Sequence, residues 1–288
     1  MSLPPHVLVD GALSDAAEGD RVEVAEATLH HLRRVLRLGD GAGLSVTDGA
    51  GRVAGAELVA GGVRLRSTPV TSPAPGPRLV LAQALSKGRR AEDAVRTACE
   101  LGVDVVVPVV AERTQGRPDA KAEAAIVGRW RAVASAALEQ SRGTRLPTVT
   151  APASGPADVL RVLARTLADA GDVPAEVPGD VVALFAVPGA SPLPTVLSSS
   201  SSSSSSSGTI VVAVGPEGGW SDRERAVAAD AGWHEVGLGP SVLRTEHAGP
   251  VALAVLAALT GRWSTAGGSP DPSSALAAAA AHGATLAP

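Results

Sequence analysis

The segment Val211–Trp220, with the sequence VVAVGPEGGW, constrains the fold more than any other part of the chain. Its first residues are small or β-branched and apolar, which predicts a strand buried on both faces. The loop Gly215–Gly219 ends this strand, and Ser221 followed three positions later by Glu224 predicts a capping box that begins a helix. In open α/β sheets, ligands bind where a strand, a loop and a helix meet in this order.

A second glycine loop, Gly237–Pro240, follows soon after and leads into Arg244–Glu246. The first loop lacks both the Rossmann glycine spacing and the lysine-serine pair of a P-loop, which argues against a phosphate cradle. Glycine lets main-chain N–H and C=O groups approach a ligand closely. Two such loops close in sequence therefore predict one flat ligand held by main-chain groups.

From Arg78 onward, strand and helix patterns alternate, which predicts a parallel sheet. Besides Ile210–Val214, the expected strands are Arg78–Leu85, Val103–Val110 and Val181–Val187. Helices are expected over residues 91–101, 122–137, Val159–Leu167 and Val251–Leu259. The last of these is apolar all round, so it must be buried on most sides, with Pro250 confined to its first turn.

The residues before Arg78 read instead as short strands with turn residues between them, which predicts a small β-barrel. Strands are expected at His6–Asp10, Arg21–Val24, Gly43–Thr47, Arg52–Val59 and Val63–Ser67. One short helix, Glu26–Arg37, interrupts them. The proline-rich stretch Thr71–Pro77 is the best domain boundary in the chain.

Composition limits the remaining possibilities. The 288 residues carry a net charge of −4 and 45% hydrophobic residues, and no apolar run approaches the roughly 20 residues of a membrane span. The single cysteine, Cys99, leaves no internal disulfide, and no Cys/His metal spacing occurs. The N-terminus does not resemble a signal peptide, so we expect a cytoplasmic protein without a metal. The polyserine run Ser198–Ser207 is expected to be a flexible loop, and residues 264–288 a disordered tail.

The two glycine-loop motifs, GPEGG and LGPSVLRTE, together resemble the ribosomal RNA small subunit methyltransferase E family. The similarity continues through LSKGRRAEDAVRTACELGVDVVVPVVAERTQG, ALEQSRGTRLP and HHLRRVLRLGDG, and so covers most of the chain from Pro5 to Trp263. Two positions depart from the family pattern, which usually has arginine at Ser241 and threonine at His247.

This resemblance implies an α/β fold of the SPOUT type with a deep trefoil knot over residues 78–263, preceded by a PUA-like RNA-binding β-barrel over residues 1–72. It implies a homodimeric enzyme that uses S-adenosylmethionine to methylate N3 of a uridine in 16S ribosomal RNA, within the small ribosomal subunit. The cofactor is expected across three loops, which are placed at Leu184–Pro188, Val214–Gly219 and Leu238–Leu243. The residues expected to bind it are Leu184, Ala186, Gly215, Pro216, Glu217, Gly218, Gly219, Leu238, Gly239, Val242 and Leu243.

Arg244 and Glu246 are the predicted catalytic residues. The imide N3–H must lose a proton, for which Glu246 and Glu217 are candidates, and Arg244 is suited to stabilise negative charge on the base. Each has a structural alternative: Glu217 as a partner of loop amides, and Glu246 as a favourable charge in the first turn of a helix. Trp220 is placed either to meet a flipped base or to pack in the core, whereas Trp130, Trp233 and Trp263 are expected to pack.

RNA binding is expected from basic residues, since it needs local rather than net positive charge. The predicted RNA-binding residues are Arg33, Arg34, Arg37, Lys87 and Arg89. The alternative is that each cluster is a solvated helix face. At the level of the whole chain, three other functions remain: a SPOUT enzyme acting on another RNA or atom, a non-catalytic RNA-binding assembly factor, and a nucleotide-dependent oxidoreductase, which the glycine spacing disfavours.

Overall fold

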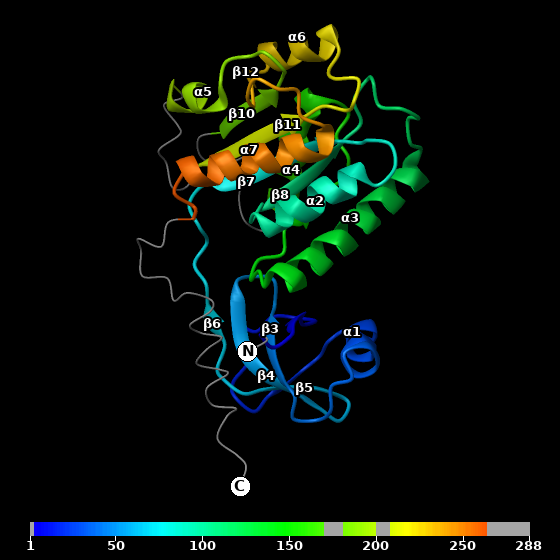
Figure 1. Cartoon of the computed structure of the whole chain (residues 1–288), viewed down its shortest axis with the longest axis vertical. Helices are drawn as coiled ribbons and strands as arrows, with labels where there is room; N and C mark the ends of the chain where they lie inside the picture. The colour runs from blue at the N-terminus through cyan, green and yellow to red at the C-terminus, as the bar shows by residue number, and fades with distance from the viewer. Residues whose placement is uncertain (1–2, 170–180, 200–207, 264–288) are drawn as a thin grey trace. The chain divides into compact units, whose positions relative to one another are not determined.

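The computed structural model describes residues 3–169, 181–199 and 208–263 (Figure 1). These residues form two compact units. The first contains the chain through Ala74 together with Leu138–Leu146, and the second contains Pro75–Ala137 and the described residues from Pro147 onward. The division after Ala74 falls inside the predicted boundary segment, whereas the assignment of Leu138–Leu146 to the first unit was not predicted. The predicted tail and most of the polyserine run lie outside the described residues.

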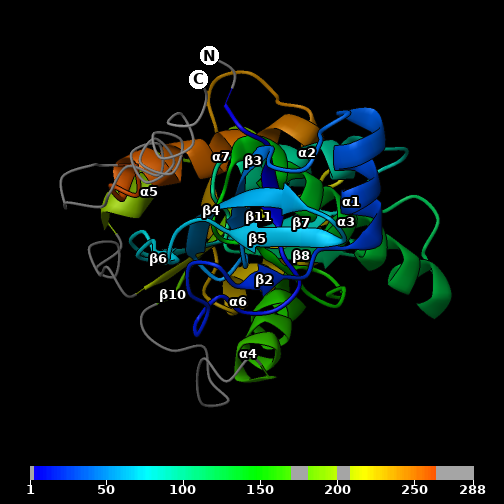
Figure 2. The same cartoon turned by 90° about the horizontal axis from the view of Figure 1, so that it is seen from below.

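The first unit is a β-barrel built from one sheet with the strand order β1-β3-β4-β5-β2, with β6 paired to β4. Strands β2 to β6 of this unit are labelled in Figure 2. A bridge between Asp10 and Glu23 joins the ends of β1 and β2 and closes the sheet. The core is filled by alternating apolar residues such as Val46, Leu58 and Val63. The strands are β1 His6–Leu8, β2 Arg21–Val22, β3 Gly43–Thr47, β4 Arg52–Val59, β5 Gly62–Leu65 and β6 Val70–Thr71.

The helix predicted over Glu26–Arg37 is shorter and less regular than expected. It consists of α1, Glu26–His30, and a π-helical turn, His31–Val35. Only Leu32 of the turn is buried. Because so little of this segment packs on the barrel, little favours a regular helix. The segment ends at Arg37, whose φ of 55° lies in the left-handed region.

The second unit contains a parallel sheet with the strand order β12-β10-β11-β7-β8-β9, which confirms the predicted sheet class. Its strands are β7 Arg78–Ala84, β8 Val105–Val109, β9 Thr148–Val149, β10 Val181–Ala186, β11 Thr209–Val214 and β12 His234–Val236. The short strands β9 and β12 were not predicted. Each has only two or three residues, too few for an apolar pattern to be recognised.

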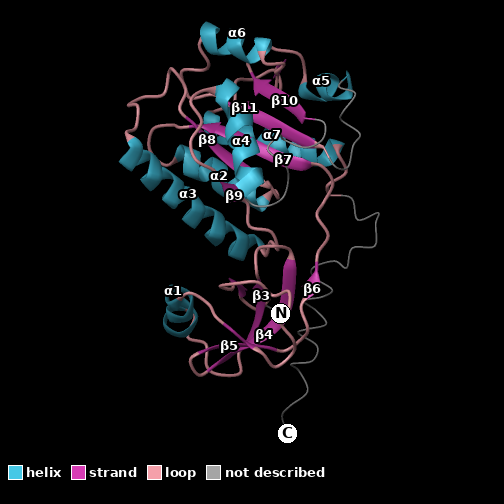
Figure 3. Cartoon of the chain, turned by 180° about the vertical axis from the view of Figure 1, so that it is seen from behind, coloured by secondary structure: helices cyan, strands magenta, loops and turns pink. Residues whose placement is uncertain are grey.

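Helices cover both faces of this sheet, which explains the all-apolar strands. On β7, Val80, Ala82 and Ala84 pack in a core with residues of α4 and α6, and α4 lies over this face in Figure 3. The alternate residues face α2 and α7, seen in front of the sheet in Figure 1. The helices are α2 Arg90–Glu100, α3 Ala120–Ser141, α4 Val159–Asp169, α5 Leu193–Ser199, α6 Asp222–Asp230 and α7 Thr245–Leu259, with a 3-10 turn at Pro156–Asp158.

Helix α7 begins earlier than predicted. It starts at Thr245, so Pro250 lies in the second turn rather than the first, and the placement predicted for this proline is wrong. A proline there removes one helical hydrogen bond. The burial of Ala248, Gly249 and Pro250 against the sheet offsets this cost.

Two smaller predictions also need correction. The first two serines of the polyserine run, Ser198 and Ser199, end helix α5 instead of belonging to a loop. Trp263 is 53% exposed, so it is not a packing residue within the described chain. Among the described helices, none combines the length and apolar character that crossing a bilayer requires.

Candidate functional site

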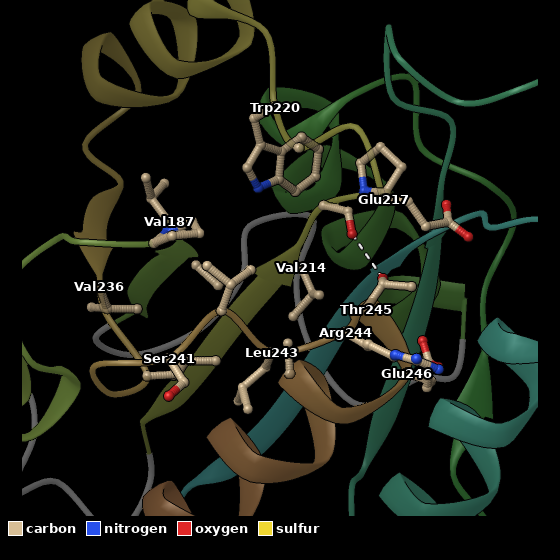
Figure 4. A pocket seen from close by; sticks show the side chains of 18 of the residues that line it. Val187, Val214, Glu217, Trp220, Val236, Ser241, Leu243, Arg244, Thr245 and Glu246 are labelled. Carbon is tan, nitrogen blue, oxygen red and sulfur yellow. Dashed lines mark hydrogen bonds and ion pairs between the residues drawn. The ribbon is translucent and has the colours of Figure 1, made fainter.

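A cavity of about 560 Å³ lies at the carboxyl ends of β10, β11 and β12, where the first turn of α7 meets them (Figure 4). Three loops line it, and they follow the three strands as predicted for the ligand site of an open α/β sheet. The last residue of each strand and the residues that follow it line the cavity: Ala186, Val187 and Pro188 from β10; Val214–Glu217, Gly219 and Trp220 from β11; and Val236, Leu238, Gly239 and Ser241–Glu246 from β12, with Arg90, Arg225 and Ala248 beside them.

The first glycine loop is fixed by the local structure on both sides. Ser221 and Glu224 form the predicted capping box: the Glu224 amide donates to Ser221 Oγ at 3.0 Å and the Ser221 amide donates to Glu224 Oε2 at 2.9 Å. Within the loop, the Gly219 amide donates to the Pro216 carbonyl at 2.8 Å, and Gly219 has a φ of 67°. This turn requires glycine at 219, since a side chain is strained at that φ.

The second loop, residues 238–243, has a different character. Across the described residues, its main-chain groups make no hydrogen bonds with the rest of the protein. Residues 239–242 are exposed, and Gly239 has a φ of 130°. Free N–H and C=O groups beside a cavity are available to a ligand, and they are the features predicted for this loop.

Four charged side chains meet at one end of the cavity. Arg90, the first residue of α2, donates to Glu217 Oε1 at 2.9 Å, and its Nε lies 4.0 Å from Glu246 Oε1. An Arg244 nitrogen lies 3.9 Å from the same oxygen of Glu246. The Arg244 side chain is 76% exposed, so it is open to solvent, whereas Glu246 is largely covered, with 13% of its side chain exposed. Figure 4 shows Glu217, Arg244 and Glu246 on one side of the cavity, opposite Val187 and Ser241.

Arg90 was missed as a site residue. In the sequence it belonged to a basic cluster with the characteristics of a solvated helix face. Its position just after the loop that follows β7 was the available signal, because the carboxyl ends of parallel strands meet at one edge of the sheet. Glu217 was predicted to act as a base or as a partner of loop amides. The structure instead gives its carboxylate an ion pair with Arg90, which was not predicted.

Trp220 packs in the core, which is one of the two alternatives predicted for it. It is 6% exposed and stacks on Phe185, with ring centroids 4.6 Å apart. Its Nε1 is buried and has no hydrogen-bond partner among the described residues. Because Trp220 also lines the cavity, this N–H is an unused donor beside the site.

Arg225 is a lining residue whose charge is already neutralised. Its guanidinium donates to both carboxylate oxygens of Glu235, at 2.7 and 2.9 Å. The hydrogen bond from Arg225 holds the pKa of Glu235 below its usual value. A bidentate pair of this kind fixes both side chains in place. Arg225 therefore shapes the wall of the cavity more than it adds charge to it.

Two predicted cofactor residues do not line the cavity. Leu184 is completely buried inside β10, before Ala186, which is the last residue of the strand and lines the cavity. Gly218 faces the other way, where its carbonyl accepts a hydrogen bond from Arg113 at 2.9 Å. The other nine predicted cofactor residues and both predicted catalytic residues line it. Of the two departures from the family pattern, Ser241 lines the cavity and is exposed, whereas His247 is exposed and not part of the lining.

The predicted RNA-binding residues differ in how free their charges are. In the first unit, Arg33 donates to Asp40 at 2.8 Å and to the Val59 carbonyl at 2.7 Å, so its guanidinium is already paired within the barrel. Arg34 and Arg37 are exposed and form no ion pair with other described residues. In the second unit, Lys87 is exposed, and Arg89 lies 3.4 Å from Glu92 in an ion pair.

Comparison with protein families gives two matches that follow the division of the chain. An RNA methyltransferase domain matches residues 73–257, and an RNA methyltransferase PUA domain matches residues 18–62. A ribosomal RNA small subunit methyltransferase E from Synechocystis is 35% identical over 243 residues, covering 83% of this chain and 73% of that protein. The protein of the same name from Mycobacterium bovis is 33% identical, covering 81% of this chain and 84% of its own length.

Solved structures agree with these matches. A ribosomal RNA small subunit methyltransferase E from Neisseria gonorrhoeae, bound to S-adenosylmethionine, superposes with a TM-score of 0.71 at 27% identity, covering 89% of this chain and 98% of that one. A putative methyltransferase from Legionella pneumophila, in complex with the same cofactor, gives a TM-score of 0.72 at 25% identity over 89% and 98% of the two chains. With a family domain over 73–257 and relatives that match along most of their length, the chain belongs to the ribosomal RNA small subunit methyltransferase E family.

Proposed function

We propose that this protein uses S-adenosylmethionine to methylate N3 of a uridine in 16S ribosomal RNA of the small ribosomal subunit, and that it does so in the cytoplasm. Family membership supports methyl transfer to ribosomal RNA. The observation that carries the proposal is the cavity itself: a loop with free main-chain groups on one side faces Arg244 and Glu246 on the other.

The residues around the cavity fit this cofactor. The loop 238–243 offers main-chain donors and acceptors to the edge of an adenine, while Leu238, Val242 and Leu243 offer apolar contact to its faces. The methionine part carries an ammonium and a carboxylate. Charges of both signs line the cavity, from Glu217 and Glu246 and from Arg90 and Arg244. The unpartnered Trp220 Nε1 and Glu246 Oε2 provide one further donor and one further acceptor.

Bound S-adenosylmethionine supplies an activated methyl group. The chain has to hold the base in line with it and accept the N3 proton, because a neutral imide nitrogen is a poor nucleophile. We assign the proton to the Glu246 carboxylate, whose Oε2 has no partner among the described residues. Arg244 is exposed enough to reach the substrate and donates to the uracil oxygen on which negative charge develops.

We also propose that the protein is a homodimer and that its second unit carries the trefoil knot that the family resemblance implies. Helix α7 packs against β7 and β11 in the middle of the sheet, and its Leu253 and Leu256 are buried. Its outer side remains apolar and uncovered: Val251 is 36% and Leu259 51% exposed. A two-fold dimer that pairs these outer sides would cover them.

The proposed function is tested by a methyl-transfer assay on small ribosomal subunits that lack the modification, compared with free 16S RNA. The product is digested to nucleosides and identified by mass spectrometry. We expect N3-methyluridine, formed only with S-adenosylmethionine present. Methylation at another atom would overturn the assigned position, and the absence of both cofactor binding and product would overturn the enzymatic proposal.

A further inference from the structure

A glutamine lies in the middle of the apolar sheet, where nothing in the sequence motifs drew attention to it. Gln83 is on β7, between β11 and β8, and is completely buried. Its Nε2 donates to Thr245 Oγ1 at 3.0 Å, with a weaker contact to the Ala84 carbonyl at 3.3 Å. Thr245 Oγ1 in turn donates to the Gly215 carbonyl at 2.8 Å. This chain of hydrogen bonds joins three segments that are far apart in sequence.

The direction of these hydrogen bonds follows from counting protons. A carbonyl only accepts, so the single hydroxyl proton of Thr245 must point to Gly215. The hydroxyl can then only accept from Gln83, which must present its NH₂ group. The Thr245 hydroxyl therefore has no proton left to donate to a ligand.

This arrangement leaves a buried polar atom unsatisfied. Gln83 Oε1 has no hydrogen-bond partner among the described residues. Helix α7 also packs closely on Gln83, so that position 249 has no room for a side chain. A Cβ on Gly249 would lie 3.1 Å from Gln83 Oε1 and 2.9 Å from Leu81 Cδ1. An apolar side chain of similar size at position 83 would avoid the unpaired oxygen. Stability alone therefore does not account for a glutamine here.

We propose that Gln83 is a positioning residue for the methyl transfer, acting through Thr245. The inference rests on the proposed function. Thr245 is the first residue of α7 and lies between Arg244 and Glu246, while Gly215 begins the first glycine loop. The hydrogen bonds hold that loop against the start of α7 and so fix the spacing between the two loops that bind the ligand. They also fix the direction in which Arg244 and Glu246 leave the helix.

The inference is tested with Gln83→Met, which keeps the volume and removes the hydrogen bond, and with Thr245→Val and Thr245→Ser. Leu81→Met, two residues earlier on the same face of β7, is the matched packing control. Hydrogen exchange of residues 215–219 and 245–249, whose hydrogen-bonded amides include Gly219, His247 and Ala248, is followed by mass spectrometry in the ligand-free protein, together with thermal unfolding, S-adenosylmethionine affinity and kcat.

For Gln83→Met and Thr245→Val we expect faster exchange in the first glycine loop and in the first turn of α7, and a loss in kcat on the order of tenfold or more, without a lower melting temperature for Gln83→Met. Thr245→Ser, which retains the hydroxyl, should restore near-normal values. The double variant Gln83→Met/Thr245→Val should lose little more than either single variant, because both break the same chain of hydrogen bonds.

Unchanged loop exchange and kcat in Gln83→Met, or equal effects of Leu81→Met, would overturn the inference. If Gln83→Met does not fold, the comparison of Thr245→Val with Thr245→Ser decides it, since equal losses would overturn it. Failure of the wild-type protein to bind S-adenosylmethionine would instead count against the proposed function. The exchange measurement needs no ligand, so it still shows whether Gln83 holds the loops.

Discussion

Gly215 lies against the indole ring of Trp220 so closely that a Cβ on Gly215 would come within 3.1 Å of ring atoms Cε2 and Nε1. The indole of Trp220 cannot move away from such a Cβ without disturbing the core, since it is buried and stacked on Phe185. The glycine at the start of the loop is therefore required by the packing beneath the loop. Its φ is not in the left-handed region, so conformational freedom is not the reason for it.

We predict that Gly215→Ala displaces Trp220 and narrows the cavity. The expected cost is about 1–3 kcal/mol in the free energy of unfolding, because an overpacked core is destabilised. Affinity for S-adenosylmethionine, measured by calorimetry, should fall at the same time. Gly128→Ala on α3 is the control: nothing lies within 4 Å of its Cβ, so it should gain roughly 1 kcal/mol from helix propensity. An alanine at 215 that leaves both quantities unchanged would contradict the packing argument.

Arg244→Met should reduce kcat by about 100-fold, since it removes the donor that we propose acts on charge developing in the transition state. Affinity for S-adenosylmethionine should change much less, because the contacts proposed for loop 238–243 are made by its main chain. Methyl transfer under single-turnover conditions measures the first effect and calorimetry the second. Arg165→Met, on an exposed position of α4, controls for the loss of one arginine. A kcat close to wild type would remove Arg244 from the mechanism.

Arg34 and Arg37 are expected to contact RNA phosphates, whereas Arg33 is not. Replacing Arg34 by Gln and Arg37 by Asn, which tolerates the left-handed conformation at 37, should reduce the slope of log K against log salt concentration by about one to two. Arg33→Gln should leave the slope unchanged and affect the barrel instead, because Arg33 is bound to Asp40 and the Val59 carbonyl. Filter binding at several salt concentrations makes the comparison. Identical slopes in all variants would mean that this surface is only solvated.

The dimer is best tested at Val251. A substitution at Leu256 would not separate assembly from folding, because Leu256 is completely buried within its own unit. Val251→Asp places a charge on the exposed side of α7, so the variant should stay folded but sediment as a monomer at micromolar concentration. Val227→Asp is the control, since Val227 is 44% exposed on α6 and should leave the dimer intact. A wild-type chain that already sediments as a monomer would refute the proposed dimer.

The first unit should lose stability in acid because of His6. Burial lowers the pKa of His6, which accepts from Ser45 Oγ and donates to the Gly143 carbonyl, each at 2.9 Å. The unfolded chain therefore takes up this proton at a higher pH than the folded one. The free energy of unfolding should fall as the pH drops below 6.5, by up to about 1.4 kcal/mol per pH unit, until the folded pKa is passed.

Urea unfolding followed by circular dichroism between pH 7.5 and pH 5 measures this loss. His6→Gln should flatten the dependence on pH in that window, while His30→Gln, an exposed position of the same unit, should not. A pH dependence that survives in His6→Gln would assign the effect to another group.

The sequence predicted best where one segment carried several independent signals. The strand ending at Val214, the glycine loop and the capping box of Ser221 and Glu224 are all present, because apolar pattern, glycine and cap agree on one local structure. The strands β3 and β4 have the predicted bounds, since turn residues flank alternating apolar residues.

The features that sequence reasoning missed depend on contacts between distant segments. No local pattern shows that Arg90 reaches Glu217, that Arg33 is bound by the Val59 carbonyl, or that Gln83 meets Thr245. The early start of α7 is of the same kind: burial against β7 and β11 outweighs the proline that locally argues against a helix there. The knot and the dimer remain predictions from the family resemblance.

The order of the strands also has a consequence for how the chain acquires its activity during translation. Every lining residue of the cavity except Arg90 lies between Ala186 and Ala248, and β11 must insert between β10 and β7, which precede it in the chain. Helix α7 then has to pack against β7 and β11. Nascent chains that have not yet extended past α7 thus lack the cavity, however well their earlier helices have formed. A partly synthesised copy on the ribosome therefore lacks the complete cavity in which we propose that the methyl donor binds.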